Sequence, residues 1–538
     1  MTKNKSLLPC SGCVHSRRAF LAGCAGCLGA TAALSSGLLV PKSLAAENRS
    51  ATDRMKIRVV FVMTEAVTPV PDWPHIHFDA NPVMEKTMNA LTAGCPEIEF
   101  IPTPLCSGPD YGTQKPGEEL SAADQAVGDI DGYIVVQVNC WHSSVHPLIA
   151  TGKPVLYADF LYGGSGGFLV YTAAHLRAKS ANFAHISSGN LADLVAAAKC
   201  LPLAGTDGNQ AFVDAVTQVR KNIVAGLNFD MGFVADEFDT LSIPDLVEEL
   251  KTKKMLTFEE GWGGDGIIPQ AKETLGIEIV RCRFAELNEL WENADRDQAQ
   301  EVVSRWKSLA AEIIGVEDET LEKSARMYLA MKTCLKNHDA GALTINCLGG
   351  FYGNHIFAYP CLGFHELLNE GLIGACECDT VSTLTMIVGT ALTKGRPGFI
   401  SDPVLDIGTK QIVYAHCVAS NKVFGPEGLS NPYTILTHSE DRQGASLRST
   451  LPSGYMTTTL EIHPSKKEII FHQAKAVGNI VDDRACRTKL AAVPVGDYEK
   501  LYTQWDHWGW HRVTFYGDLK EPIFALAEAI GFKVVEEA

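Results

Sequence analysis

The sequence has no excess of positive charge. Its 46 lysines and arginines are outnumbered by 63 aspartates and glutamates, and the net charge is −17. Residues 1–46 hold five of the cations and no acid, so their removal would take the net charge to −22. Such a surface repels phosphate backbones and anionic lipids. The composition therefore argues against a nucleic-acid-binding protein, whereas an uncharged sugar would not be repelled.

Long apolar runs and repeats are also missing beyond residue 46. No segment there is long and apolar enough to span a bilayer, and no internal repeat or low-complexity tract is present. The glycine-rich run Gly163–Gly167 lacks the Lys-Ser/Thr pair and the spaced glycines of nucleotide-binding loops, so we interpret it as a flexible turn. What remains is an ordinary globular composition, with 46% hydrophobic and 20% charged residues over 538 positions, enough for two to three domains.

Residues 1–46 have the features of an export signal. Arg17 and Arg18 lie in the sequence SRRAFL, an Ala/Leu/Gly-rich run follows to Val40, and residues 43–45 supply small side chains at the expected cleavage position. This pattern predicts a twin-arginine signal. It implies a transient partner, the twin-arginine translocase, and a location in the periplasm or outside the cell. The alternative is a disordered basic tail with a chance arginine pair.

Cysteine is not scarce, and its 16 residues form two groups. Four of them make two C-x-x-C pairs ten residues apart, a spacing typical of tetrathiolate zinc or iron–sulfur sites: Cys10, Cys13, Cys24 and Cys27. The second pair falls in the apolar part of the signal, which argues against a cluster, but a redox metalloprotein stays an alternative. The other twelve lie mostly in apolar segments, and we expect buried thiols, because a protein exported in folded form closes its core in a reducing cytosol.

Strands and helices alternate over the first two thirds of the chain. Apolar strands are expected over 57–62, 132–138, 154–159 and 182–187, the last opening a second α/β segment that includes the strand 277–284. Near-continuous apolar strands separated by helices predict parallel sheets covered on both faces. After Pro397 the pattern changes to strands joined by turns, and the turn Pro464–Lys467 predicts an antiparallel hairpin.

Residues 376–402 carry the most chemical information. Their sequence, CECDTVSTLTMIVGTALTKGRPGFISD, places acids on both sides of an apolar helix. A strand over 374–379 would put Glu377 and Asp379 on one face, and a short strand ending before Pro403 would deliver Asp402 to the same end of the helix. Hard divalent cations need oxygen ligands arranged in this way, and so does proton transfer between adjacent carbons. Solvated acids at strand ends are the alternative.

Local sequence signals mark the two ends of this helix. Thr380 or Ser382 is expected to cap its start, and Gly395 occupies the position of a left-handed terminator.

This segment, together with the preceding YPCLGFHELLNEGLIGACE, resembles the L-fucose isomerase and L-arabinose isomerase-like family. There a Cys/Leu-rich helix leads into C-E-x-D, and a helix containing Thr-Met runs on to F-x-x-D. The resemblance extends to a C-terminal H-x5-G pattern, here His511 and Gly517, followed by an apolar helix. It implies a divalent metal, usually Mn²⁺, bound by Glu377, Asp402 and His511. The chain departs from the best-known members of that family in two ways. Its interval from the Glu to the Asp is one residue longer, and cysteines flank Glu377 on both sides.

The resemblance and the pattern together predict the organisation of the chain. We expect an α/β protein in which two Rossmann-like α/β domains precede a mainly antiparallel β-rich C-terminal domain. The expected boundaries are a signal over 1–46, an N-terminal domain over 52–180, a second domain over 181–395 and a C-terminal domain over 396–538. We also expect a homo-oligomer.

Two further residues are candidates for contacts with a sugar. Trp141 follows a strong strand, where open α/β sheets bind ligands, and could stack on a sugar face, although structural packing would explain it equally well. His416 ends a β run and could hydrogen bond to a substrate hydroxyl, or could be a core histidine. His507 is an alternative to His511 as third metal ligand.

The resemblance, together with these residues, implies a metal-dependent aldose–ketose isomerase that transfers a proton through a cis-enediol, with Glu377 and Asp402 as catalytic residues. Three alternatives stay open: a periplasmic sugar-binding protein without catalysis, the redox metalloprotein, and a relative of the same fold with altered chemistry on a sugar derivative.

Overall fold

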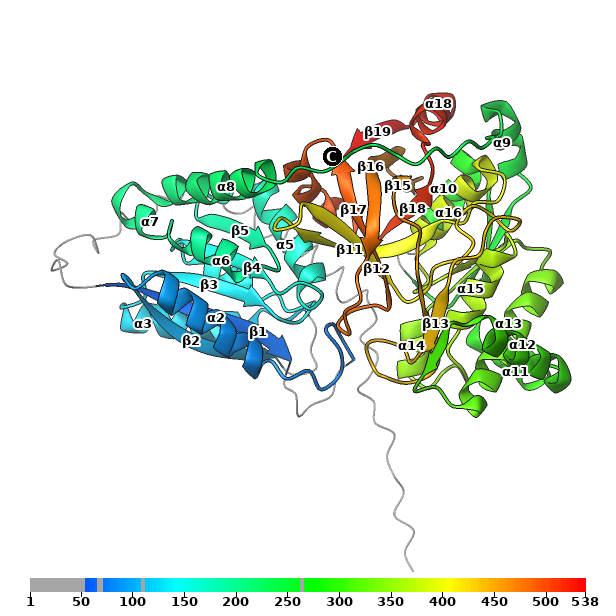
Figure 1. Cartoon of the computed structure of the whole chain (residues 1–538), viewed down its shortest axis with the longest axis horizontal. Helices are drawn as coiled ribbons and strands as arrows, with labels where there is room; N and C mark the ends of the chain where they lie inside the picture. The colour runs from blue at the N-terminus through cyan, green and yellow to red at the C-terminus, as the bar shows by residue number, and fades with distance from the viewer. Residues whose placement is uncertain (1–53, 65–70, 108–111, 262–265) are drawn as a thin grey trace, which may run out of the picture.

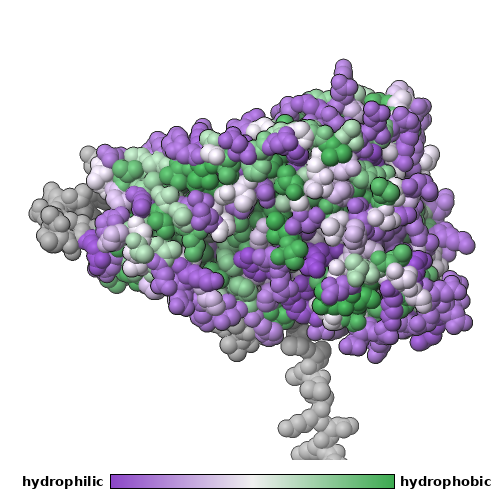
Figure 2. Space-filling model, viewed as in Figure 1, coloured by the Kyte–Doolittle hydropathy of each residue, from purple (hydrophilic) through white to green (hydrophobic). Residues whose placement is uncertain are grey.

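A computed structural model describes residues 54–64, 71–107, 112–261 and 266–538 (Figure 1). It is a mixed α/β structure in which two parallel sheets precede an antiparallel sheet region. The predicted signal, including Arg17, Arg18 and the paired cysteines, lies outside the described residues. Within them, no helix has the length and apolar character needed to cross a membrane. Hydrophilic and hydrophobic residues are mixed over the face shown in Figure 2.

The first sheet is fully parallel, with the strand order β2-β1-β3-β4-β5. Every residue of β3, β4 and β5 is buried, which confirms a sheet covered on both faces. Its strands are β1 (Met55–Thr64), β2 (Ile98–Ser107), β3 (Gly132–Gln137), β4 (Val155–Asp159) and β5 (Phe183–Ser187). Its helices are α2 (Asn81–Gly94), α3 (Lys115–Val127), α4 (Val145–Ala150), α5 (Ser165–Ala178), α6 (Leu191–Ala198), α7 (Pro202–Thr206) and α8 (Asn209–Ala225).

The structure differs from the expected boundary at residue 180. Strand β5 pairs with β4 along its whole length, and α8 packs against it. The strand over 182–187 therefore closes the first sheet and does not open the second unit. An isolated apolar strand carries no signal of which sheet it will join, and this is the physical reason for the difference.

The second sheet is also parallel, with the order β10-β9-β6-β7. Its strands are β6 (Lys254–Phe258), β7 (Glu278–Cys282), β9 (Ala342–Ile345) and β10 (Ile373–Ala375). The helices of this unit are α9 (Ile243–Leu250), α10 (Ile267–Leu275), α11 (Phe284–Glu292), α12 (Arg296–Leu309), α13 (Asp318–Asn337), α14 (Cys347–Tyr352), α15 (Cys361–Asn369) and α16 (Thr380–Leu392). A short strand of this unit, β8 (Glu312–Ile314), pairs with β13 (Tyr433–Leu436), which also pairs with β14 (Ser446–Ser449).

The C-terminal sheet runs β15-β18-β11-β12-β17-β16-β19 and is antiparallel except for the β16–β19 pair. Because β15 also pairs with β16, six of its strands close into a barrel. The strands are β11 (Phe399–Asp406), β12 (Gln411–His416), β15 (Met456–His463), β16 (Glu468–Asn479), β17 (Thr488–Val495), β18 (Arg512–Tyr516) and β19 (Lys533–Glu536). The connecting helices are the 3₁₀ helix Tyr498–Tyr502, α17 (Trp505–Trp508) and α18 (Lys520–Ile530). His463 faces Glu468 across the predicted turn, which confirms the hairpin.

Helix α16 connects the second sheet to the barrel. It follows β10 directly, it is buried along its entire length, and it packs against β15 and β18. Its start therefore lies where the second unit meets the barrel (Figure 1).

Candidate metal centre

A tight turn between β10 and α16 carries Glu377. The strand ends at Ala375, and both Glu377 (φ 64°) and Cys378 (φ 53°) are left-handed, so the expected strand over 374–379 is wrong beyond Ala375. Non-glycine residues in this region cost about 1–3 kcal/mol each and cluster at functional sites. The helix cap is Asp379, whose carboxylate accepts from the Ser382 backbone N–H at 2.9 Å, in place of the expected Thr380 or Ser382.

The other end of α16 matches the expectation only in part. The helix ends at Leu392, and Lys394 already adopts a left-handed φ of 55°. Gly395 follows at φ 117°, and its N–H donates to the Thr390 carbonyl at 2.8 Å. The terminating role of Gly395 is thus shared with the lysine before it.

Strand register brings three further side chains to this turn. Asp402 lies inside β11, which continues to Asp406, so the strand is longer than expected and does not end before Pro403. Ser401 pairs with Arg512 of β18, which places Asp402 beside His511. Asp402 also pairs with Ala415 of β12, so His416 is its next neighbour.

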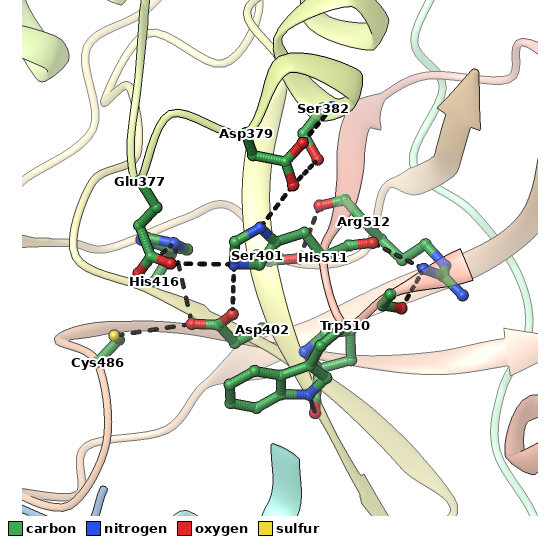
Figure 3. Close-up of polar contacts among 12 residues, drawn as sticks. Glu377, Asp379, Ser382, Ser401, Asp402, His416, Cys486, Trp510, His511 and Arg512 are labelled. Carbon is green, nitrogen blue, oxygen red and sulfur yellow. Dashed lines mark hydrogen bonds and ion pairs between the residues drawn. The ribbon is translucent and has the colours of Figure 1, made fainter. Parts of the chain in front are cut away.

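Glu377, Asp402, His416 and His511 converge on one point (Figure 3). One ligand atom from each lies within 4.8 Å of all the others, and all four residues are buried. Nε2 of His511 is 2.9 Å from Asp402 Oδ1 and 3.6 Å from Glu377 Oε2. Nε2 of His416 is 3.8 Å from Asp402 Oδ2 and 3.9 Å from Glu377 Oε1. Ligands held at about 2.1 Å from one octahedral ion are about 3.0 Å apart when adjacent and about 4.2 Å when opposite. The spacing therefore fits a single divalent ion.

Hydrogen bonds assign different roles to the two histidines. Nδ1 of His511 donates to Asp379 Oδ2 at 2.7 Å, which directs the Nε2 lone pair at the carboxylates, as in carboxylate–histidine–metal arrangements. Nδ1 of His416 instead accepts from the Cys417 N–H at 2.8 Å, so its Nε2 carries the proton. His511 has the form of a metal ligand, whereas His416 presents a donor to whatever lies between the carboxylates.

Two buried polar atoms of this group lack a well-formed hydrogen bond: His416 Nε2, and Asp402 Oδ1, which has the His511 Nε2 as an ion-pair neighbour at 2.9 Å. Buried polar atoms without partners are costly, and such an atom in a native site indicates an unseen ion, water or ligand. A cation held by the carboxylates would satisfy Asp402, and a substrate oxygen would satisfy His416. The residues present therefore fit both a hard divalent metal and a hydroxylated ligand.

The nearby carboxylates raise the pKa of both histidine rings, His511 and His416. Burial alone lowers the pKa of His511, but Asp402, Asp379 and Glu377 together raise it well above its usual range. Burial also lowers the pKa of His416, yet Asp402 and Glu377 contribute to raising it to about 9. A divalent ion between the carboxylates would offset this negative charge and weaken its effect on the pKa of both rings.

Two further acids lie near this group, the half-buried Glu440 and the buried Asp72, and sequence reasoning missed both. Burial raises the pKa of Glu440 to about 7, Tyr352 donates to its Oε2 at 2.6 Å, and it interacts electrostatically with Glu377. Burial, reinforced by the charge of Glu440, raises the pKa of Asp72 well above its usual range. Neither acid belongs to a motif, and each comes from a different loop, so no sequence signal could have found them.

Trp510 forms one wall beside Asp402 (Figure 3). Its ring packs edge-on against Trp141 and Trp73, each with centroids 5.0 Å away, and its Nε1 donates to the Pro403 carbonyl at 3.2 Å. Trp141 is thus placed by the first sheet against the candidate site, and stacking on a sugar stays a prediction for it. His507 is exposed and lies outside the converging group, so the structure favours His511 over this alternative.

The glycine run contributes to this wall, and the predicted turn is present only at Gly163 and Gly164, because α5 begins at Ser165. Gly163–Gly167 is buried and opens helix α5. A Cβ at Gly166 would lie 2.9 Å from the Trp510 ring, and one at Gly167 would lie 2.0 Å from the Cys140 carbonyl oxygen. The glycines therefore permit close approach of α5 to the site, a use of glycine that composition alone does not distinguish from flexibility.

Thiols surround this group without forming disulfides. None of the twelve cysteines in the described residues forms a disulfide, and ten of them are buried. Cys417 and Cys486 lie beside it, with Sγ atoms 3.4 Å apart, and Cys486 Sγ is 4.0 Å from Asp402 Oδ2. The buried thiols agree with the expectation from composition.

The chain is similar in sequence to proteins named as sugar isomerases. No family model matches the chain. It is 26% identical over 283 residues to a sulfoquinovose isomerase of Clostridium sp. (strain MSTE9), covering 50% of this chain and 61% of that protein. It is 22% identical over 273 residues to a sulfoquinovose isomerase of Priestia aryabhattai, covering 49% and 59%. These matches span about three fifths of the length of the curated relatives.

Solved structures resemble the chain only weakly. A sugar ABC transporter from Yersinia enterocolitica subsp. enterocolitica 8081 is 11% identical with a TM-score of 0.17, covering 57% of this chain and 69% of that one. A C2-type ketoreductase from a modular polyketide synthase is 12% identical with a TM-score of 0.20, covering 56% and 74%. Likeness at this level supports no argument about fold or function.

Proposed function

We propose that this protein is a metal-dependent aldose–ketose isomerase acting on a sugar or sugar derivative. The observation that carries the proposal is the buried convergence of Glu377, Asp402 and His511, whose ligand atoms lie within 4.8 Å of one another. The relatives named sulfoquinovose isomerase support the reaction class and make sulfoquinovose the first sugar to test.

The proposed ligands are Glu377, Asp402 and His511, with Asp379 holding the His511 ring. Carboxylate-rich sites suit hard ions such as Mn²⁺, which lies at the weak end of the divalent affinity series. Loading before export would protect such a site from copper and zinc, which links the proposed signal to the proposed metal. When bound, the ion would stabilise negative charge on adjacent substrate oxygens.

The chain's own groups would carry the proton. Isomerisation removes a proton from the carbon beside the carbonyl and returns one to the neighbouring carbon, through a cis-enediol. Glu377, in the turn before α16, and Asp402, in β11, would accept and return this proton. His416 Nε2–H would donate to a substrate oxygen, and Glu440, with its pKa raised to about 7, could hold a proton close to Glu377.

Hydrogen exchange at carbon tests this function directly. The Mn²⁺-loaded protein, incubated in D₂O with sulfoquinovose and a panel of aldoses and ketoses, should place deuterium at C2 of an aldose or C1 of a ketose, as measured by NMR. Chelation should abolish the exchange and Mn²⁺ should restore it. If no sugar exchanges carbon-bound hydrogen, isomerisation is excluded for that panel. If the protein then still binds a sugar after chelation, the alternative of a non-catalytic sugar-binding protein is favoured. If it converts a sugar into a product that is not the isomer, a relative with altered chemistry is favoured.

We also propose export through the twin-arginine pathway. Replacing Arg17 and Arg18 together by lysine keeps the charge but removes the paired guanidinium groups by which the signal is recognised. The precursor should then accumulate in the cytoplasm, as followed by fractionation and immunoblotting. Unchanged processing near Ala45 in the double variant would show that the pathway is a different one.

A further inference from the structure

A second group of metal-ligating side chains lies away from the candidate metal centre. Cys282, Glu286, Cys334 and His338 each offer a ligand atom within 4.8 Å of the other three. Cys282 ends β7, the edge strand at the far side of the second sheet from β10 and the Glu377 turn. The two groups share no residue, and Cys282 ends a different strand from the one that leads into Glu377.

Three elements build this group. Cys282 is the last residue of β7, and Glu286 lies in the first turn of α11, which follows at once. Cys334 lies near the end of α13 and His338 is its C-cap, so the two share one helix face at a spacing of four residues. Helix α11 packs against α13, and this packing brings the two pairs together.

The donor atoms face one another closely. Nε2 of His338 lies 2.6 Å from Glu286 Oε1, and Cys334 Sγ lies 3.6 Å from the same oxygen. The sulfur atoms of Cys334 and Cys282 lie within 4.8 Å of each other. The cysteines are buried, at 5% and 0% exposure, whereas the Glu286 and His338 side chains are 37% and 29% exposed. The group is thus anchored in the core and open to an ion from solvent.

We propose that these four residues bind Zn²⁺ as a structural site. Two thiolates, an imidazole and a carboxylate are the ligand types of tetrahedral zinc, held at about 2.0–2.3 Å. The sulfur atoms of such a site are about 3.8 Å apart, which the separations here accommodate. Because thiolates are soft ligands, this site would bind zinc in preference to a hard ion. The candidate metal centre, with its two carboxylates, would prefer a hard ion. Bound zinc ties the end of α13 to β7 and α11.

The same contacts allow two other arrangements, a metal-free hydrogen-bonded cluster and a Cys282–Cys334 disulfide. Metal analysis of the full chain, purified with reductant and dialysed after addition of Zn²⁺, distinguishes them. About one zinc per chain should remain, and Co²⁺ in its place should give the near-ultraviolet sulfur-to-cobalt absorption that only thiolate ligation produces. No retained zinc and no such absorption, or a Cys282–Cys334 disulfide found by peptide mapping, would overturn the proposal.

Substitutions of the proposed ligands test which residues bind the zinc. Cys282→Ser and Cys334→Ser should lose the zinc and the absorption, whereas Cys106→Ser, on an exposed thiol of β2, should keep both. His338→Ala removes a half-exposed ligand, so it should fold and weaken zinc binding by more than about tenfold. Zinc should raise the melting temperature of the wild type but not of His338→Ala.

Two further variants keep this inference separate from the proposed function. Glu377→Gln should lose the hard ion and any isomerase activity but retain zinc. Cys486→Ser should also retain the cobalt absorption. Loss of the absorption in Cys486→Ser but not in Cys334→Ser would move the thiolate site to the Cys417–Cys486 pair and overturn the assignment.

Discussion

Asp402→Asn should lower turnover by about 10²–10⁴-fold while changing sugar affinity far less. An amide cannot accept the substrate proton, and that proton transfer occurs only in the transition state, so the loss should appear in kcat and not in KM. Asparagine is also a poorer ligand for a hard cation, and partial loss of metal would increase the damage. Steady-state kinetics with excess Mn²⁺, together with metal content, measure both effects. Wild-type kcat in the variant would remove Asp402 from the mechanism.

Two variants serve as controls for Asp402→Asn. Asp406 is a buried carboxylate on the same strand that accepts from the Gly189 and Gly408 N–H groups, so Asp406→Asn tests for general damage to β11. It should change stability but neither metal content nor the rate per folded molecule. His511→Ala should mainly weaken metal affinity, and excess Mn²⁺ should restore part of its rate because two carboxylates remain. Equal rescue of His511→Ala and Asp402→Asn would mean that Asp402 acts only as a ligand.

Sequence reasoning found the three converging residues but not how they are held. The C-E-x-D pattern and the C-terminal histidine predicted that Glu377, Asp402 and His511 meet, and the structure brings them together. The predicted strand geometry around Glu377 was wrong, because two consecutive left-handed residues leave no periodicity signature. The role of His416 depends on a hydrogen bond to the next residue's N–H, which only coordinates can show.

The same limit applies to the fold. Apolar strands alternating with helices predicted the parallel sheets, since that pattern follows from burial on both faces. The domain boundary at residue 180 was wrong because pairing between β4 and β5 is a long-range choice. The hairpin at Pro464–Lys467 was predicted from local turn chemistry, but closure of the barrel rests on a further pairing of β15, with β18. Local signals predict elements and neighbours, and long-range pairing decides which elements share a sheet.

A buried ion pair behind the candidate centre depends on the last residues of the chain. The Arg512 and Glu537 side chains are fully buried, Arg512 Nη2 donates to Glu537 Oε1 at 3.0 Å, and His472 Nδ1 lies 3.0 Å from Glu537 Oε2. Arg512 also donates to the His511 carbonyl at 2.7 Å, so the pair holds the backbone of a proposed ligand. Burial alone would raise the pKa of Glu537, but Arg512 and His472 lower it to about 2.

Glu537→Gln should therefore lower the free energy of unfolding by about 3–5 kcal/mol at pH 7, because it leaves a buried guanidinium without its counter-charge. Glu537 has a lower pKa when folded than when unfolded, so its contribution is complete above about pH 4.5 and is lost as pH falls toward about 2. Urea unfolding from pH 7 to pH 3 should show wild type and variant converging. Glu536→Gln is the matched control, since that exposed carboxylate pairs with Lys520 at 3.2 Å and should contribute less than about 1 kcal/mol. Equal losses in the two variants would show that the buried pair adds no more stability than a surface one.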